Sequence, residues 1–93
     1  MKKKKAKQLY DHFEELADKI GITIIDGKGD FSGGYCTVID DQFIVLNKLK
    51  PLTQRLRVLA ESFSRLDVQK QYLIPVLREF IEENSQLNQK THL

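Results

Sequence analysis

The segment from position 51 to position 67 reads Pro51-Leu52-Thr53-Gln54-Arg55-Leu56-Arg57-Val58-Leu59-Ala60-Glu61-Ser62-Phe63-Ser64-Arg65-Leu66-Asp67. Its apolar side chains recur at intervals of three and four residues, which places them on one face of an α-helix. These residues are Leu52, Leu56, Leu59, Ala60, Phe63 and Leu66. Pro51 suits the first turn, where a helix tolerates proline. The segment therefore predicts an amphipathic helix with one face in the core.

A helix is also predicted before this segment, from about Lys4 to Lys19. Its apolar residues again share one face, and they are Leu9, Phe13, Leu16, Ala17 and Ile20. Gly21 follows directly, and glycine commonly ends a helix because it accepts the left-handed conformation.

Three short strands are predicted between these two helices, at 22–25, 35–39 and 42–46, because β-branched and aromatic residues are frequent there. The loop 27–34 holds four of the five glycines. Asp40 and Asp41 tolerate a tight turn, which predicts a hairpin at 39–42. The apolar run 43–46 does not alternate with polar residues, so we expect a central strand covered on both faces.

The order of elements predicts an α+β fold. A last helix begins near Pro75 and carries on its inner side Leu73, Val76, Leu77, Phe80 and Ile81. The polar tail, residues 85–93, is expected to fray. The expected fold is a helix, a three-stranded mostly antiparallel sheet with the 39–42 hairpin, and two helices packed on the sheet.

Length and charge indicate a single domain, residues 1–93, with a net charge of only +2. This balance gives no global electrostatic case for nucleic-acid binding. Five of the fifteen cations precede the first apolar face, and they are Lys2, Lys3, Lys4, Lys5 and Lys7. We expect residues 1–7 to form a disordered, solubilising basic arm. The alternative is that this arm contacts RNA, DNA or an anionic membrane, helped in the nucleic-acid case by Lys28, Lys48 and Lys50.

Cysteine usage and hydropathy bear on the compartment. Cys36 is the only cysteine, so no internal disulfide can form, which is typical of a reducing setting. The Met-Lys start has no apolar region behind it, and no apolar run approaches membrane-spanning length. The sequence therefore predicts a soluble cytoplasmic protein with no membrane partner.

No metal, cofactor or catalytic set is predicted. The two histidines, His12 and His92, lie near opposite ends of the chain, whereas a zinc site needs three or four ligands. We expect a surface histidine and a packed Cys36. The glycine-rich loop precedes a strand and not a helix, which disfavours phosphate binding. Aromatic residues near the glycines are candidates for stacking on nucleic-acid bases, but such residues more often belong to the core. They are Phe31, Tyr35 and Phe43.

The helix sequence Leu59-Ala60-Glu61-Ser62-Phe63-Ser64-Arg65-Leu66, after a helix and a small sheet, resembles the active-site helix of the minimal gluzincin metallopeptidases. The resemblance covers the layout of about residues 6 to 85. In that family a strand, here ending near Asn47, leads to a helix with the motif H-E-x-x-H, and a later glutamate completes a zinc site.

The motif itself is absent. The resemblance places Glu61 and Arg65 at the two histidine positions and Ser62 at the position of the general base. It therefore implies a degenerate site that lacks both imidazoles and the carboxylate that activates water. Glu61 and Arg65 are four residues apart with the acid first, which favours an ion pair in the vacated site. The alternative is an ordinary surface pair on an amphipathic helix.

The predicted function is a small, non-catalytic, intracellular protein-interaction domain on a zincin-like, metal-free scaffold. The partner is another protein or a second copy, and a dimer would form through an exposed edge strand or through Val58 and Val68. One alternative is a nucleic-acid-binding module that uses the basic arm. The other is an enzyme of unrecognised type that uses Cys36 or the carboxylates of Asp40 and Asp41.

Overall fold

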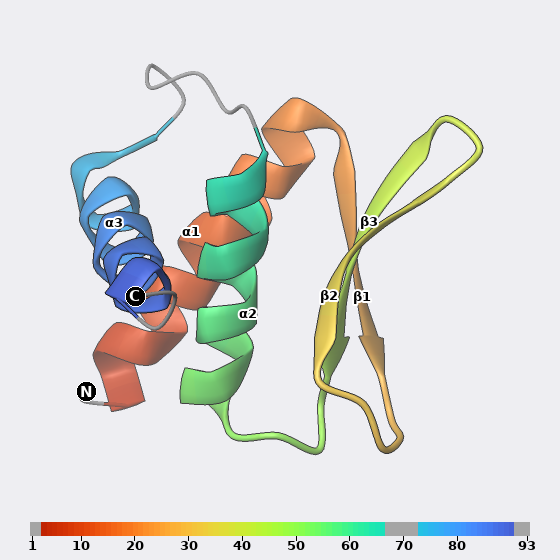
Figure 1. The fold of residues 1–93 in the computed structure, drawn as a ribbon, viewed down its shortest axis with the longest axis horizontal. Helices are drawn as coiled ribbons and strands as arrows, with labels where there is room; N and C mark the ends of the chain where they lie inside the picture. The colour runs from red at the N-terminus through yellow and green to blue at the C-terminus, as the bar shows by residue number, and fades with distance from the viewer. Residues whose placement is uncertain (1–2, 67–72, 91–93) are drawn as a thin grey trace.

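The structure, a computed structural model, describes residues 3–66 and 73–90, with side chains described up to residue 84. Lys2, His92 and Val68, considered above, lie outside the described residues. The elements in chain order are α1 (Lys3–Ile20), β1 (Ile22–Gly27), β2 (Gly33–Val38), β3 (Asp41–Asn47), α2 (Leu52–Arg65) and α3 (Pro75–Lys90) (Figure 1). The α+β prediction is confirmed.

The sheet has three strands in the order β1-β3-β2. β3 pairs with β2 in antiparallel fashion and with β1 in parallel fashion, so the prediction of a mostly antiparallel sheet is corrected to a mixed sheet. The reason is the path of the chain. After β1 the chain passes to the far edge, forms β2 there, and returns through the hairpin into the centre in the direction of β1.

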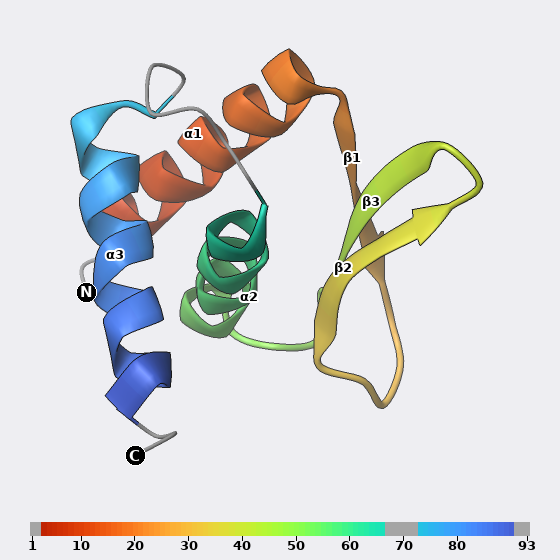
Figure 2. The ribbon, with the colours of Figure 1, turned by 45° about the horizontal axis from the view of Figure 1, so that its top comes forward.

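All three helices lie on one side of the sheet (Figures 1 and 2). α1 packs on β1, α2 packs on β2 and β3, and α3 packs against α1 and α2 on the side away from the sheet. The prediction that both later helices pack on the sheet is therefore corrected for α3. Aromatic rings join the helices. The ring of Phe13 stacks on Phe63 at 5.5 Å between centroids and meets Phe80 edge-on at 6.1 Å. The predicted apolar faces of the helices thus form one core.

β3 is the central strand, as predicted, but it is covered on one face only. Ile44 and Leu46 point to the helices and have no exposed surface. Phe43 and Val45 alternate with them and are half-buried. The apolar run arises because the face of the sheet away from the helices is also uncharged. That face carries Phe43, Val45 and Ile25, the last of which is 41% exposed.

The two terminal helices include residues that were expected to be disordered or frayed, although the helix predicted from about Lys4 to Lys19 is confirmed as α1. The expected disordered arm is corrected, because Lys3 to Lys7 form the first turns of α1, where Ala6 is 2% exposed and ties the helix end to the core. The expected frayed tail is also corrected, because α3 continues to Lys90. Residues 91–93 lie outside the described part of the chain.

The hairpin between β2 and β3 is confirmed, but its turn lies one residue earlier than predicted. Val38 pairs with Asp41, so the two turn residues are Ile39 and Asp40. Ile39 has a φ of 59°, a left-handed conformation that β-branched residues rarely adopt. Pairing with β3 therefore places Ile39 at a turn position where an aspartate was expected, and Asp40 supplies the other.

Candidate functional site

A pocket of about 170 Å³ lies between β2 and the outer side of α2. We call it the β2–α2 pocket. Its lining residues are Gly33, Gly34, Tyr35, Val58, Glu61, Ser62 and Arg65. The three positions singled out on α2 by the gluzincin resemblance therefore share one pocket. Val58, a predicted dimer contact, also lines it.

The sheet wall of this pocket depends on Gly33. Its φ is +100°, and a Cβ atom added there would lie 2.4 Å from the carbonyl oxygen of Val45 on β3. Real Cβ atoms do not approach an oxygen so closely, so only glycine lets β2 meet β3 at this point. Gly33 and Gly34, which were predicted as the end of the loop 27–34, are instead the first two residues of β2.

Glu61 and Arg65 form the predicted ion pair, with 3.6 Å between Oε1 and Nη2. The side chains are 41% and 76% exposed, respectively. An ion pair in contact with solvent stabilises a fold by less than about 1 kcal/mol. The pair thus lines the pocket in contact with solvent and contributes little to folding.

Ser62 is buried at 4% exposure, and its Oγ donates a hydrogen bond of 2.8 Å to the carbonyl oxygen of Val58. This bond lies within α2 and engages the only hydroxyl proton of Ser62. The described lining of the pocket thus offers an ion pair, a tyrosine and backbone groups. These groups suit hydrogen bonding and packing with a ligand.

β2 forms one edge of the sheet and runs along this pocket. It pairs with β3 on one side only, so its other side presents backbone N–H and C=O groups outward. Its sequence, Gly33-Gly34-Tyr35-Cys36-Thr37-Val38, contains no charged residue and no proline. Edge strands usually carry such residues, which block pairing with another chain.

Asn47, at the end of β3, is a structural residue that was not among the predicted site residues. It is 1% exposed. Its Nδ2 donates hydrogen bonds of 2.7 Å to the carbonyl oxygens of Gly29 and Phe31, and its Oδ1 accepts one of 3.0 Å from the N–H of Leu49. Asn47 thereby fixes the loop that enters β2. The sequence feature that could have indicated this role is an asparagine directly after the apolar run 43–46, in a chain with the glycine-rich loop 27–34.

The other candidate side chains do not gather at this pocket. Cys36 is exposed, so the expectation of a packed cysteine is corrected. Its position on the edge strand, beside Phe43 on the uncovered face, explains the exposure. Asp40 and Asp41 are exposed at the hairpin turn. Phe31 and Tyr35 are half-buried; Phe31 packs beside the glycines of its loop, and Tyr35 packs against the core.

The lysines considered above as nucleic-acid contacts lie on two separate parts of the fold. Lys3, Lys4, Lys5 and Lys7 are exposed on α1. Lys28 and Lys48 lie where β1 and β3 end, and the N–H of Lys48 donates to the carbonyl oxygen of Gly27 at 2.9 Å. Lys50 follows in the connection to α2.

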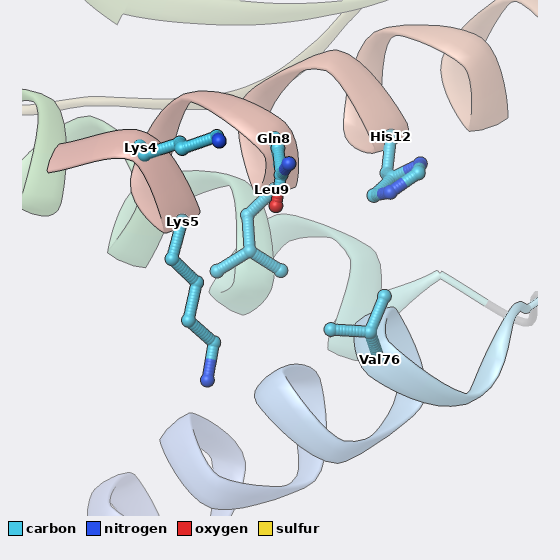
Figure 3. A pocket seen from close by; sticks show the side chains of 6 residues that line it. All are labelled: Lys4, Lys5, Gln8, Leu9, His12 and Val76. Carbon is cyan, nitrogen blue, oxygen red and sulfur yellow. The ribbon is translucent and has the colours of Figure 1, made fainter. Parts of the chain in front are cut away.

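A second pocket, of about 410 Å³, lies between α1 and α3. We call it the α1–α3 pocket. Its lining residues are Lys4, Lys5, Gln8, Leu9, His12 and Val76. Figure 3 shows Leu9 and Val76 pointing into the space between the helices and Lys5 extending from α1 toward α3. His12 lines this pocket. It lies on a different element from Cys36, and the α1–α3 pocket and the β2–α2 pocket share no lining residue.

A polar cluster joins α1, β1 and α2. The hydroxyl of Tyr10 donates to Oδ1 of Asp26 at 3.5 Å, and the guanidinium of Arg55 lies 5.9 Å from the centre of the tyrosine ring. Burial raises the pKa of Tyr10 above its ordinary value of 10.0, and the negative charges of Asp26 and Glu14 raise it further, against the opposing effect of Arg55. Tyr10 therefore stays protonated at neutral pH.

Within residues 3–66 and 73–90, no group of three or more His, Cys, Asp or Glu side chains is placed to hold a metal ion. No helix in the same part of the chain is long and apolar enough to cross a membrane. Comparison of the chain with models of protein families, with curated proteins and with solved structures found no match.

Proposed function

We propose that this chain is a non-catalytic protein-interaction domain that binds an extended segment of a partner protein along the outer edge of β2. The segment adds a strand to the sheet by pairing with the outward backbone groups of β2. Its side chains on one side enter the β2–α2 pocket. Strand addition of this kind draws affinity from main-chain hydrogen bonds and specificity from pockets for alternate side chains.

The observation that carries this proposal is an uncharged edge strand that borders a pocket. The six residues of β2 contain nothing that repels an incoming strand. At the other edge of the sheet, β1 carries Asp26. The ion pair of Glu61 and Arg65 lies beside β2, where it can choose among partner side chains by charge.

The proposal that the domain is non-catalytic is supported by the interactions of Glu61, Ser62 and Arg65 on α2. The Glu61 carboxylate is paired with Arg65, and the Ser62 hydroxyl is bonded to Val58 within the helix. A degenerate zincin-like scaffold is part of the same proposal, supported by the lining of one pocket by positions 61, 62 and 65. A cytoplasmic setting is also proposed, because the exposed thiol of Cys36 suits a reducing compartment.

A peptide library tests this function. The full chain is immobilised, linear peptides displayed on phage are selected, and enriched peptides are titrated into isotope-labelled protein. We expect amide chemical-shift changes concentrated at residues 33–38. Enrichment of no peptide, or changes concentrated outside β2 and the β2–α2 pocket, would contradict the proposal.

Two exposed threonines on opposite edges provide a matched control. Thr37→Lys places a charge on β2 and should weaken peptide binding about tenfold or more, because an edge lysine opposes strand addition. Thr23→Lys places the same charge on β1 and should leave binding unchanged. Equal losses in the two variants would count against the β2 edge as the binding site.

A further inference from the structure

The tip of the β2–β3 hairpin, residues 38–41, places an apolar side chain where a turn favours glycine. Ile39 has a φ of 59° and is 94% exposed, and its neighbour Val38 is 57% exposed. A single exposed apolar residue needs no explanation. Here, however, the exposed residue is β-branched and holds a left-handed conformation that costs free energy. Neither the turn nor the core benefits from isoleucine at this position.

Backbone strain that the fold does not need is often associated with a contact outside the fold. Asp40 and Asp41 follow the two apolar residues, so the hairpin tip combines an apolar point with two carboxylates. The carboxylates are repelled by an anionic membrane surface. A surface complementary to the hairpin tip therefore has an apolar hollow bordered by positive charge. Such a surface belongs to a protein.

The α1–α3 pocket has this character. The half-buried Val76 and the edge of Leu9, which is 1% exposed, form its apolar floor, and Lys4, Lys5 and His12 lie around it (Figure 3). Its volume of about 410 Å³ lies within the range of about 300–1,000 Å³ found for binding pockets, so it has room for branched aliphatic side chains.

The hairpin tip and this pocket lie at opposite ends of the molecule (Figures 1 and 2). The tip projects beyond the sheet, whereas α3 and the N-terminal half of α1 lie on the far side of α2. The tip of a chain therefore cannot reach its own pocket. Two copies can make the contact in a head-to-tail arrangement.

We propose that the hairpin tip of one copy docks into the α1–α3 pocket of a second copy. Ile39 and Val38 pack against Val76 above the buried Leu9, and the carboxylates of Asp40 and Asp41 pair with the ammonium groups of Lys4 and Lys5. The two partner surfaces differ, so the contact is heterologous, and repetition gives a ring or an open chain of copies. The contact does not use the β2–α2 pocket.

Sedimentation equilibrium of the full chain, from micromolar to millimolar concentration at low salt, tests self-association. We expect reversible association that weakens as salt rises, because charge pairing at a surface is screened. A wild-type chain that stays monomeric across this range overturns the proposal. Arg65→Gln serves as a control in the other pocket and should associate like the wild type; a loss there would also contradict the proposal.

Ile39→Gly separates docking from folding. Glycine suits the positive φ of this turn, so thermal unfolding should occur at the same or a higher temperature than in the wild type. The association constant should fall by about tenfold or more, the value of burying one isoleucine side chain. Association unchanged by this substitution would overturn the proposal.

Mixing two defective variants tests the head-to-tail geometry. Ile39→Gly keeps its pocket, and the double substitution Lys4→Glu and Lys5→Glu keeps its hairpin tip. Acidic residues suit the first turn of a helix, so the double variant should stay folded. Each variant alone should be monomeric at concentrations where the wild type associates, and an equal mixture should form a 1:1 complex with one contact. Absence of that complex, or a mixture that assembles beyond two copies, would overturn the proposed arrangement.

Discussion

Gly33 lies against the carbonyl oxygen of Val45 so closely that a Cβ atom on residue 33 would be 2.4 Å from that oxygen. The φ of +100° at Gly33 independently favours glycine. The position therefore combines a steric and a conformational requirement at the point where β2 enters the sheet beside the β2–α2 pocket. Two substitutions can separate the two requirements.

Gly33→Ala should lower the free energy of unfolding by about 2–4 kcal/mol, because the added methyl group forces β2 away from β3 and is strained at positive φ. Urea denaturation measures this loss. Gly34→Ala is the matched control, because its φ of +155° also strains a side chain but a Cβ atom there meets nothing within 4 Å. Its cost should be about 1–2 kcal/mol, which is the conformational part alone. Equal costs at the two positions would show that the contact with Val45 is not the cause.

Asn47→Ala should destabilise the fold by about 2–3 kcal/mol, because the carbonyl groups of Gly29 and Phe31 lose their donor at a buried site. Hydrogen exchange should also become faster in the loop 28–32. The measurements are urea denaturation and exchange followed by mass spectrometry.

A second asparagine in the chain serves as the control for that prediction. Asn84 donates one hydrogen bond of 2.9 Å to the carbonyl oxygen of Phe80 within α3 and is half-buried. Asn84→Ala should change stability by about 0.5 kcal/mol or less, because alanine is the better helix former. If both substitutions cost the same, the loop-holding role of Asn47 is wrong.

The stability of the wild type should decline above about pH 10, in part because of Tyr10. Burial, Asp26 and Glu14 raise the pKa of Tyr10 in the folded state, so the unfolded chain loses this proton first. The full contribution is present below the unfolded pKa and is lost as pH rises through the folded pKa. Tyr10→Phe should therefore show a shallower alkaline decline, measured by urea denaturation at several pH values. A steeper decline in this variant would refute the assignment.

Asp26→Asn should lower the pKa of Tyr10 toward its ordinary value while leaving it raised, because burial is the larger cause and remains. Absorbance near the tyrosinate band measures the titration, in a background where Tyr35 and Tyr72 are replaced by phenylalanine. A pKa of Tyr10 that rises in this variant would be incompatible with the charge effect of Asp26.

Glu61→Gln and Arg65→Gln should each change the free energy of unfolding by less than about 1 kcal/mol, because the ion pair is in contact with solvent. The purified wild type should contain no stoichiometric zinc, and neither substitution should change that. Elemental analysis of metal content and urea denaturation provide the two measurements. One zinc ion per chain would end the proposal of a metal-free scaffold.

The helices were predictable because their apolar residues repeat with a strong period. Phe13, Phe63 and Phe80 were each assigned to an inner face, and the structure brings their rings together. The central place of β3 was also readable, since Ile44 and Leu46 belong to an unbroken apolar run. That run could not reveal that only one face is covered, because periodicity does not distinguish a covered face from an uncharged open one.

The remaining features depend on contacts between distant residues. The parallel pairing of Ile24 with Ile44 follows from strand order, which local sequence does not encode. The one-residue shift of the hairpin turn follows from the pairing of Val38 with Asp41. The three α2 positions were assigned together from a motif, but their meeting with Gly33 in one pocket required the register of β2 against β3.

The parallel pairing of β1 with β3 also affects how the chain folds while it is being synthesised. Ile22 pairs with Gln42 and Gly27 with Asn47, so each residue of β1 is synthesised twenty residues before its partner on β3. At about 5–20 residues per second, this delay lasts roughly 1–4 s on a ribosome. During it, α1 is the only neighbour of β1 already made, and it packs on that strand in the finished fold. We expect α1 to shield Ile22 and Ile24 from other nascent chains until the hairpin closes.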